Sequence, residues 1–290
     1  MEIILGETAG FCYGVKRAVD GAKEELLKTK DILYCLGEIV HNQEVINDLK
    51  NKGLQFIEKI EESKGKTIIR AHGVQKSIYE KAQKLKIHLY DYTCPKVLKI
   101  HEIAEKYAKN GYYIFLCGSK THPENIGTIS FCGDNCRIIE KLEDVQKEIN
   151  NYKKSNCEKL LLISQTTYNL EKFIEIENLI KKELPEKSII KNTICKATQL
   201  RQTETREIAK QVDCMIIIGG KNSSNTKKLY DIAKENCNIA ICIETKEEIN
   251  ITKLSKYEKI GIMAGASTPK ESIEEVINLL EEIDKTLIKT

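Results

Sequence analysis

Short apolar runs alternate with longer amphipathic segments along the whole chain. The apolar runs are rich in Ile, Leu, Tyr and Val, as in "ILYCLGEIV", "YYIFLCG" and "VDCMIIIGG". The segments between them carry Lys and Glu at helical spacing, as in "KEELLKTK" and "EKLEDVQKEINNYKK", which is typical of solvent-exposed helix faces. This alternation predicts βα units and a largely parallel sheet in each domain of an α/β protein.

The junctions between predicted strands and helices repeat three times. A cysteine stands immediately ahead of a long helical segment in "GFCYGVKRAVDGAKEEL", in "DYTCPKVLKIHEIAEKYA" and in "NTICKATQLRQTETREIAK". These cysteines are Cys12, Cys94 and Cys195. Ligand sites in parallel α/β folds gather at the carboxyl ends of strands, so such loops are candidates for function.

Two further strand-end loops follow each cysteine, and the first of these two lies 28 or 29 residues after it. The second loops of the three sets contain His41, His122 and the run Ser223, Ser224 and Asn225. The third loops contain His72, Thr166 and Ser267. The repetition predicts three similar α/β domains, at residues 1–86, 87–187 and 188–290.

Composition and charge narrow the class of protein. A chain of 290 residues with a net charge of +3 gives no reason to expect nucleic acid or a membrane surface as partner. No apolar run reaches the roughly 20 residues of a membrane span, and the N-terminus lacks a signal-peptide pattern, so we expect a cytoplasmic protein.

In a reducing compartment the default for eleven cysteines is free thiols. Four of them lie in or beside apolar runs and are predicted to be buried: Cys35, Cys117, Cys214 and Cys242. The pair in "CGDNC", Cys132 and Cys136, is predicted to be a surface-loop coincidence.

The three junction cysteines suit a metal centre assembled from distant parts of the chain. Three similar units around a pseudo-threefold axis would bring Cys12, Cys94 and Cys195 together, although no C-x2-C pair exists among them. Thiolates at helix starts favour a soft metal. An iron–sulfur cluster is normally held by four cysteines, so three would leave one iron open for chemistry.

The remaining loop residues suit a small anion. His, Ser, Thr and Asn side chains beside glycines, together with backbone N–H groups at helix starts, are donors to phosphate oxygens. Glu124, two residues from His122 in "THPENIG", is the candidate proton donor, because neighbouring negative charge would raise its pKa. His88 and His101 fall within a predicted strand and helix and are assigned no role.

Eight ordered motifs together resemble one family: "GFCYGVKRA", "AHGV", "TCPKV", "HPENIG", "SQTT", "NTICKATQLRQ", "GGKNSSNT" and "AGASTP". The chain is similar to the 4-hydroxy-3-methylbut-2-enyl diphosphate reductases, the LytB family, from about residue 6 to about residue 280. The resemblance implies a three-domain trefoil around one central [4Fe–4S] cluster, with Cys12, Cys94 and Cys195 as ligands and one iron open to substrate. It also implies a reductive dehydroxylation of the allylic diphosphate substrate to isopentenyl and dimethylallyl diphosphates, with ferredoxin or flavodoxin as electron donor.

The resemblance assigns roles to the loop residues as well. Glu124 would be the proton source and Thr166 would lie near the reacting end of the substrate. The diphosphate would be bound by His41, His72, His122, Ser223, Ser224, Asn225 and Ser267. Two positions depart from the family pattern: Lys196 stands where an acidic residue is expected, and Met263 where a small or hydroxylated one is usual.

Two other functions fit parts of the pattern. A zinc hydrolase could use three thiolates and a water on a phosphate substrate. A non-catalytic module that binds a phosphorylated metabolite would need the histidine and hydroxyl loops but not the cysteines. Iron content and the effect of Cys94→Ser on ligand affinity would separate these functions from a reductase.

Overall fold

The computed structural model describes residues 1–287, with side chains described to Glu282. Within this range the chain alternates regularly between strands and helices, as the sequence predicts. The strands are β1 (Glu2–Leu5), β2 (Leu33–Leu36), β3 (Gln55–Ile57), β4 (Lys66–Ile69), β5 (Leu89–Asp91), β6 (Tyr113–Cys117), β7 (Cys136–Ile139), β8 (Leu160–Ser164), β9 (Ser188–Ile190), β10 (Cys214–Ile218), β11 (Ile239–Ile243) and β12 (Lys259–Ala264). The helices are α1 (Tyr13–Lys28), α2 (Gln43–Asn51), α3 (Lys76–Lys84), α4 (Pro95–Lys109), α5 (Pro123–Ile129), α6 (Leu142–Lys153), α7 (Leu170–Glu183), α8 (Lys196–Ala209), α9 (Ser224–Asn236), α10 (Ile251–Leu254) and α11 (Lys270–Leu287), with 3₁₀ turns at Ile60–Glu62 and Lys246–Glu248.

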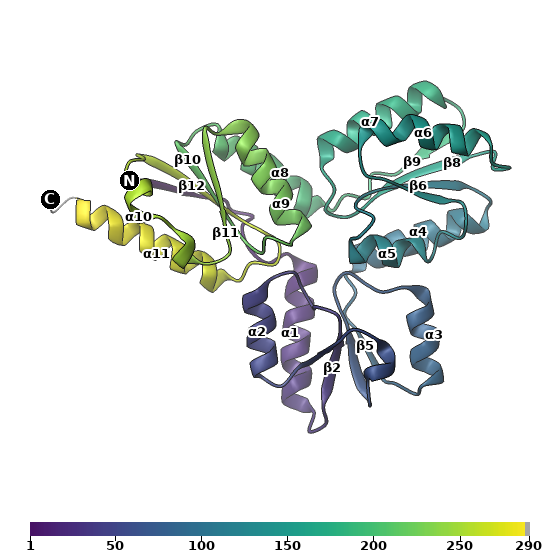
Figure 1. The fold of residues 1–290 in the computed structure, drawn as a ribbon, viewed down its shortest axis with the longest axis horizontal. Coiled ribbons are helices and arrows are strands. Elements are labelled where there is room, and N and C mark those ends of the chain that lie inside the picture. The colour runs from purple at the N-terminus through teal and green to yellow at the C-terminus, as the bar shows by residue number, and fades with distance from the viewer. Residues whose placement is uncertain (288–290) are drawn as a thin grey trace. The chain divides into compact units, whose positions relative to one another are not determined.

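The strands form three four-stranded sheets, and all of their pairings are parallel. The sheet orders are β3-β2-β4-β5, β7-β6-β8-β9 and β1-β12-β10-β11, and Figure 1 shows each sheet with helices beside it. The predicted class, an α/β protein with three similar parallel sheets, is confirmed.

Read as β11-β10-β12-β1, the third sheet has the same strand order as the other two. It takes its edge strand β1 from the start of the chain. β1 pairs with β12, with Glu2 opposite Lys259 and Leu5 opposite Ile262. β1 therefore occupies in this sheet the place that β5 and β9 occupy in theirs. Each junction cysteine thus follows the edge strand β1, β5 or β9 that completes a sheet. In the sequence repeat, by contrast, each cysteine stands near the start of its repeat.

Both faces of the central strands are buried. In β6, Tyr113, Phe115 and Cys117 face one apolar cluster, and Ile114 and Leu116 face another. The first cluster includes side chains of α6 and α7, and the second includes side chains of α4. Helices on both faces explain why this strand reads as a continuous apolar run instead of alternating with polar residues.

By contacts the chain separates into two compact units. Unit 1 contains Met1–Lys16, His41–Ile46 and the chain from Lys196 on, and unit 2 contains Arg17–Val40 and Asn47–Cys195. The sheet of β1 belongs to unit 1, and the other two sheets belong to unit 2. The limits 1–86, 87–187 and 188–290 stay a prediction as domain boundaries, although strand pairing departs from them at β1, at β5 and at β9. In the part of the chain that is described, no helix is long and apolar enough to cross a membrane.

Candidate active site

Every predicted site residue lies just beyond the carboxyl end of a strand or at the start of the helix that follows it. Such a position is expected for ligand sites in parallel α/β folds. Unit 1 holds Cys12, His41, Ser223, Ser224, Asn225 and Ser267. Unit 2 holds Cys94, Cys195, His72, His122, Glu124 and Thr166.

The three junction cysteines have matching surroundings. Each is half-buried, takes part in no disulfide and lies directly before a helix, α1, α4 or α8. Each also donates its backbone N–H to the third loop of the neighbouring set: Cys12 to the carbonyl of Ala266 (3.1 Å), Cys94 to that of Ala71 (2.9 Å) and Cys195 to that of Thr166 (2.9 Å).

The N-termini of the helices that follow these cysteines suit an anionic ligand. The first turns of α1, α4 and α8 contain no acidic residue, whereas those of α5, α6 and α7 do. The positive end of the helix dipole is therefore not neutralised by a carboxylate of the same turn, which favours an anionic ligand there. Three half-buried cysteine sulfurs outside any disulfide are the kind of donor that an iron–sulfur cluster requires, so the residues present fit that group.

Glu124 is buried and bound directly to Thr166. The side chain of Glu124 is 1% exposed. Its two carboxylate oxygens accept hydrogen bonds from the backbone N–H and the hydroxyl of Thr166, both at 2.6 Å. Burial raises the pKa of Glu124 to about 7, against the lowering effect of the two hydrogen bonds from Thr166. A carboxyl group with this pKa can deliver a proton at neutral pH.

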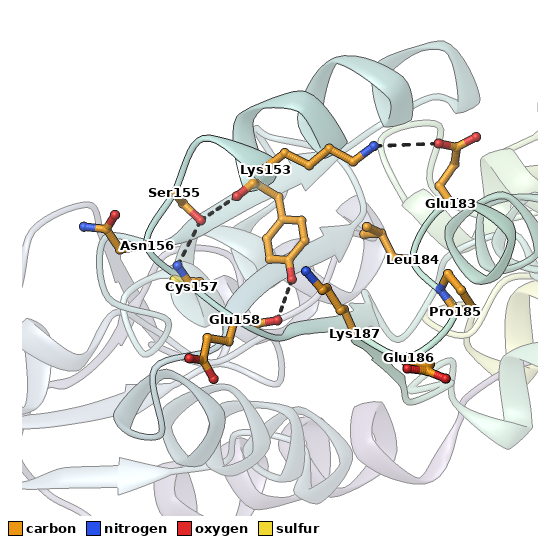
Figure 2. A pocket seen from close by; sticks show the side chains of 11 residues that line it. Lys153, Ser155, Asn156, Cys157, Glu158, Glu183, Leu184, Pro185, Glu186 and Lys187 are labelled. Carbon is orange, nitrogen blue, oxygen red and sulfur yellow. Dashed lines mark hydrogen bonds and ion pairs between the residues drawn. The ribbon is translucent and has the colours of Figure 1, made fainter.

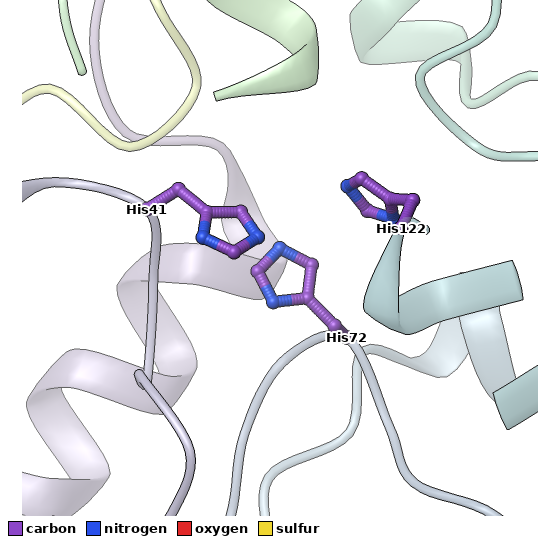
Figure 3. Close-up of side chains that lie close together, drawn as sticks. All are labelled: His41, His72 and His122. Atoms are coloured by element: carbon purple, nitrogen blue, oxygen red, sulfur yellow. The ribbon is translucent and has the colours of Figure 1, made fainter. Parts of the chain in front are cut away.

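His122 begins the helix that carries Glu124. As the N-cap of α5 it accepts the backbone N–H of Glu124 at its Nδ1 (3.2 Å), which places the proton of the neutral ring on Nε2. The ring of His72 meets that of His122 edge to face, with 5.4 Å between centroids (Figure 3). The structure therefore brings together four predicted residues of unit 2, namely His72, His122, Glu124 and Thr166.

Two residues that the sequence analysis did not single out join these loops. The Gln165 side-chain oxygen accepts hydrogen bonds from the Asn125 side-chain amide (2.8 Å) and the Ser119 backbone N–H (3.3 Å). The Asn125 amide also donates to the Ser119 carbonyl (2.8 Å). Both residues lie inside the motifs "HPENIG" and "SQTT", next to Glu124 and Thr166. Their place in these motifs, directly beside Glu124 and Thr166, was the signal that could have identified them, whereas their burial is seen only in the structure.

In unit 1 the loops of His41 and Ser267 are in contact. The Ser267 hydroxyl donates to the His41 carbonyl at 3.2 Å. Gly220 lies against the same carbonyl so closely that a Cβ atom at this position would overlap it. The glycine therefore permits the "GGKNSSN" loop to reach His41.

Asn225 presents a buried amide with no internal partner. Its side chain is 4% exposed, and within the described residues neither its oxygen nor its nitrogen has a hydrogen-bond partner. The neighbouring Ser223 is the N-cap of α9 and accepts the Thr226 N–H at 3.4 Å. A buried amide without a partner costs free energy, and this arrangement is typical of a side chain that binds a ligand.

Helix α8 holds the Cys12 loop through a buried polar face that sequence reasoning missed. Arg201, 4% exposed, donates to the Gly10 carbonyl at 2.6 Å. Glu204 accepts the backbone N–H groups of Glu7 and Thr8. The signal was the polar stripe along "KATQLRQTETRE", where the buried positions of the helix are Thr198, Arg201, Gln202 and Thr205.

The structure also tests the burial predicted for the other cysteines. Cys35, Cys117 and Cys214 are buried as predicted, and Cys242 is half-buried. The prediction for Cys132 is wrong, because its thiol is 1% exposed in an apolar cluster and donates to the Thr128 carbonyl.

The two departures from the family pattern lie in different environments. Lys196 is exposed at the start of α8, whereas Met263 is fully buried against Gly6.

A surface hollow of about 570 Å³ lies away from these loops. Figure 2 shows its lining, which includes Ser155, Cys157, Glu183 and Lys187. These residues precede β8 and β9, so the hollow lies at the amino ends of the strands, whereas the candidate residues follow the carboxyl ends. It is therefore separate from the candidate site.

Comparisons with known proteins show which family this chain belongs to. A family model described as LytB protein matches residues 3–281. A 4-hydroxy-3-methylbut-2-enyl diphosphate reductase of Clostridioides difficile (strain 630) is 41% identical over 285 residues, which cover 98% of this chain and 100% of that protein. A protein of the same name from Caldanaerobacter subterraneus subsp. tengcongensis is 43% identical and covers 98% of both chains.

Solved structures extend the likeness to the fold. The E-1-hydroxy-2-methyl-but-2-enyl-4-diphosphate reductase of Plasmodium falciparum matches with a TM-score of 0.89 and 33% identity, over 96% of this chain and 87% of that one. A second structure, an (E)-4-hydroxy-3-methyl-but-2-enyl diphosphate reductase described as the terminal enzyme of the non-mevalonate pathway, matches with a TM-score of 0.70 and 40% identity, over 97% of this chain and 100% of that one. The family model covers nearly the whole chain, and the relatives align along its full length, so this protein belongs to the LytB family of reductases.

Proposed function

We propose that this chain reduces 4-hydroxy-3-methylbut-2-enyl diphosphate to isopentenyl and dimethylallyl diphosphates. The observation that carries the proposal is the buried Glu124 carboxyl group, held at both oxygens by Thr166, in the loop that begins with His122. A proton donor beside an anion-binding histidine is what removal of a hydroxyl group from an allylic diphosphate requires.

The proposed cofactor is one [4Fe–4S] cluster per chain, held by Cys12, Cys94 and Cys195. When bound, it would supply electrons and a Lewis-acidic iron for the substrate hydroxyl. The three cysteines, none of them in a disulfide, stand at helix starts without acidic first turns, which supports this assignment. The electron donor is proposed to be a ferredoxin or flavodoxin in the cytoplasm, where eleven free cysteines are expected to stay reduced.

The diphosphate would be bound by histidine, hydroxyl and amide donors. The N–H of His122 at Nε2 can donate to a phosphate oxygen, and His72 lies beside it in unit 2. In unit 1 the unpaired amide of Asn225 can donate as well, at the start of α9 where backbone N–H groups also favour an anion. The proposed ligands are His41, His72, His122, Ser223, Ser224, Asn225 and Ser267.

The proton would come from Glu124. Its pKa of about 7 means that a large fraction of the group is protonated at neutral pH. Thr166 fixes the orientation of the carboxyl group, and burial keeps bulk water from competing for the proton. The reaction balances when two electrons and two protons convert the C–OH group of the substrate into a C–H group and one water molecule.

The proposal is tested on protein purified without oxygen. Iron and sulfide content and the visible spectrum are measured before and after addition of the allylic diphosphate, and the two products are assayed with a chemical reductant. We expect a brown protein whose spectrum responds to the substrate and which forms both products. A colourless, zinc-containing protein that hydrolyses the diphosphate in air would overturn the proposal. So would a metal-free protein that only binds it.

A further inference from the structure

His101 lies where three functional segments of unit 2 meet. It is in α4, two turns after Cys94, and its side chain is 3% exposed. A Cβ atom built on Gly73 would lie 3.0 Å from the Cε1 atom of His101, so the loop that carries His72 rests directly on this ring. Gly73 has a φ of +72°, a conformation that L side chains rarely adopt.

The helix that carries Glu124 contacts the same ring and the same loop. A Cβ atom on Gly127 of α5 would lie 3.6 Å from the Nε2 atom of His101 and 3.3 Å from the Val74 carbonyl oxygen. On its other side His101 stacks on Phe131, with 4.4 Å between centroids and an interplanar angle of 17°. The ring therefore fills the space between α4, α5 and the His72 loop.

Hydrogen bonds fix both ends of the loop that carries His72. Upstream of His72, the Ala71 carbonyl accepts the Cys94 N–H at 2.9 Å. Downstream, the Lys76 N–H donates to the Ser130 hydroxyl at 2.9 Å, and that hydroxyl donates to the Gly127 carbonyl at 2.6 Å. The ends of the loop are thus fixed, and its middle is set by what packs beneath it.

We propose that His101 is a positioning residue, whose ring sets the place of His72 relative to His122 and thereby the affinity for the diphosphate. The inference rests on the proposed function. The shape of the ring matters and its charge does not, because within the described residues neither ring nitrogen has a hydrogen-bond partner. Burial also lowers the pKa of His101 to about 4, so the ring is neutral.

The test compares His101→Ala, which removes the ring, with His101→Phe, which keeps an aromatic ring without nitrogens. We expect His101→Ala to raise KM for the allylic diphosphate and Kd for inorganic diphosphate about tenfold, with kcat within about threefold of wild type. His101→Phe should restore both constants, whereas His101→Gln, which is polar but has no ring, should not. Calorimetry with inorganic diphosphate gives a readout that does not depend on turnover.

A second pair of variants approaches the loop from the other side. Gly127→Ala should push on the Val74 carbonyl and raise the same two constants. Gly65→Ala is the control, because a Cβ atom there meets nothing within 4 Å.

If His101→Ala fails to fold, the His101→Phe, His101→Gln and Gly127→Ala variants decide between the outcomes. The inference is overturned if His101→Ala binds diphosphate like wild type, or if His101→Phe is as defective as His101→Gln. Wild-type protein that neither binds diphosphate nor reduces the substrate contradicts the proposed function instead.

Discussion

Thr166 donates two hydrogen bonds to Glu124, one from its backbone N–H and one from its hydroxyl, each at 2.6 Å. The two residues are far apart in the sequence and lie after different strands of one sheet. Their pairing holds the carboxyl group in a single orientation while burial keeps its pKa near neutrality. The orientation of the proposed proton donor thus depends on Thr166 as much as on the position of Glu124 itself.

Replacing Glu124 by Gln should abolish turnover without disturbing the fold. The Gln oxygen can accept the Thr166 N–H and its amide can donate to the hydroxyl, but the amide cannot deliver the proton. We expect kcat to fall by about 10²-fold or more, with iron content and diphosphate binding unchanged. Glu143→Gln, an exposed glutamate in the first turn of α6, is the control and should be fully active. Comparable loss in both variants would contradict the role of Glu124.

Replacing Thr166 by Val should shift the alkaline side of the pH–rate profile upward. The Thr166 hydroxyl favours the ionised carboxylate, and its removal raises the pKa of Glu124 above about 7. Since the protonated acid is the active form, activity would persist to higher pH in the variant. The pH dependence of kcat/KM is measured for both proteins with the same substrate, so that substrate ionisation is common to both. A shift to lower pH would count against this account.

Replacing Cys94 by Ser should remove most of the iron and all reduction. The thiolate is the soft ligand that a hydroxyl cannot replace. Cys157→Ser is a matched control, because Cys157 is also a half-buried free thiol but does not stand before a helix. Iron, sulfide and the visible spectrum are measured for both variants under anaerobic conditions. Full iron content in Cys94→Ser would exclude this cysteine as a ligand.

Replacing Asn225 by Ala should weaken diphosphate binding while leaving stability unchanged or higher. The amide makes no hydrogen bond within the described residues, so its removal costs the fold nothing and frees no buried partner. We expect Kd for inorganic diphosphate to rise about tenfold, the effect of one lost hydrogen bond to a charged ligand. Asn169→Ala provides the contrast, because Asn169 caps α7 through the Lys172 N–H at 2.9 Å. That variant should lose about 1 kcal/mol of unfolding free energy and keep its affinity.

The two departures from the family pattern should behave differently on substitution. Met263→Ala removes a fully buried side chain packed against Gly6 and should lower the free energy of unfolding by about 2–4 kcal/mol. Lys196→Asp changes an exposed residue and should alter stability by less than about 0.5 kcal/mol. Chemical unfolding of both variants under reducing conditions measures these differences. Equal effects would contradict the burial difference between them.

Much of the candidate site could be proposed from the sequence because its motifs are local. The motifs around Cys12, Cys94 and Cys195, and the loops after each strand, consist of residues whose type and spacing already indicate thiolate ligands and anion donors. Gln165, Asn125 and Arg201 were missed, because a polar residue in a motif or helix looks solvent-exposed until the structure shows that it is buried. Cys132 was placed in a surface loop because polar residues follow it in "CGDNC", but the structure buries it in an apolar cluster.

The sequence by itself determined the alternation of strands and helices, the α/β class and the three sets of strand-end loops, because these depend on periodicity and on short motifs. Only the tertiary structure decided that β1 completes the sheet of β12, that Thr166 binds both oxygens of Glu124, and that His101 lies under the His72 loop. Each of these joins segments that are distant in the chain. Local preference carries no information about such pairings, which are selected by the burial of whole faces and by the satisfaction of buried polar groups.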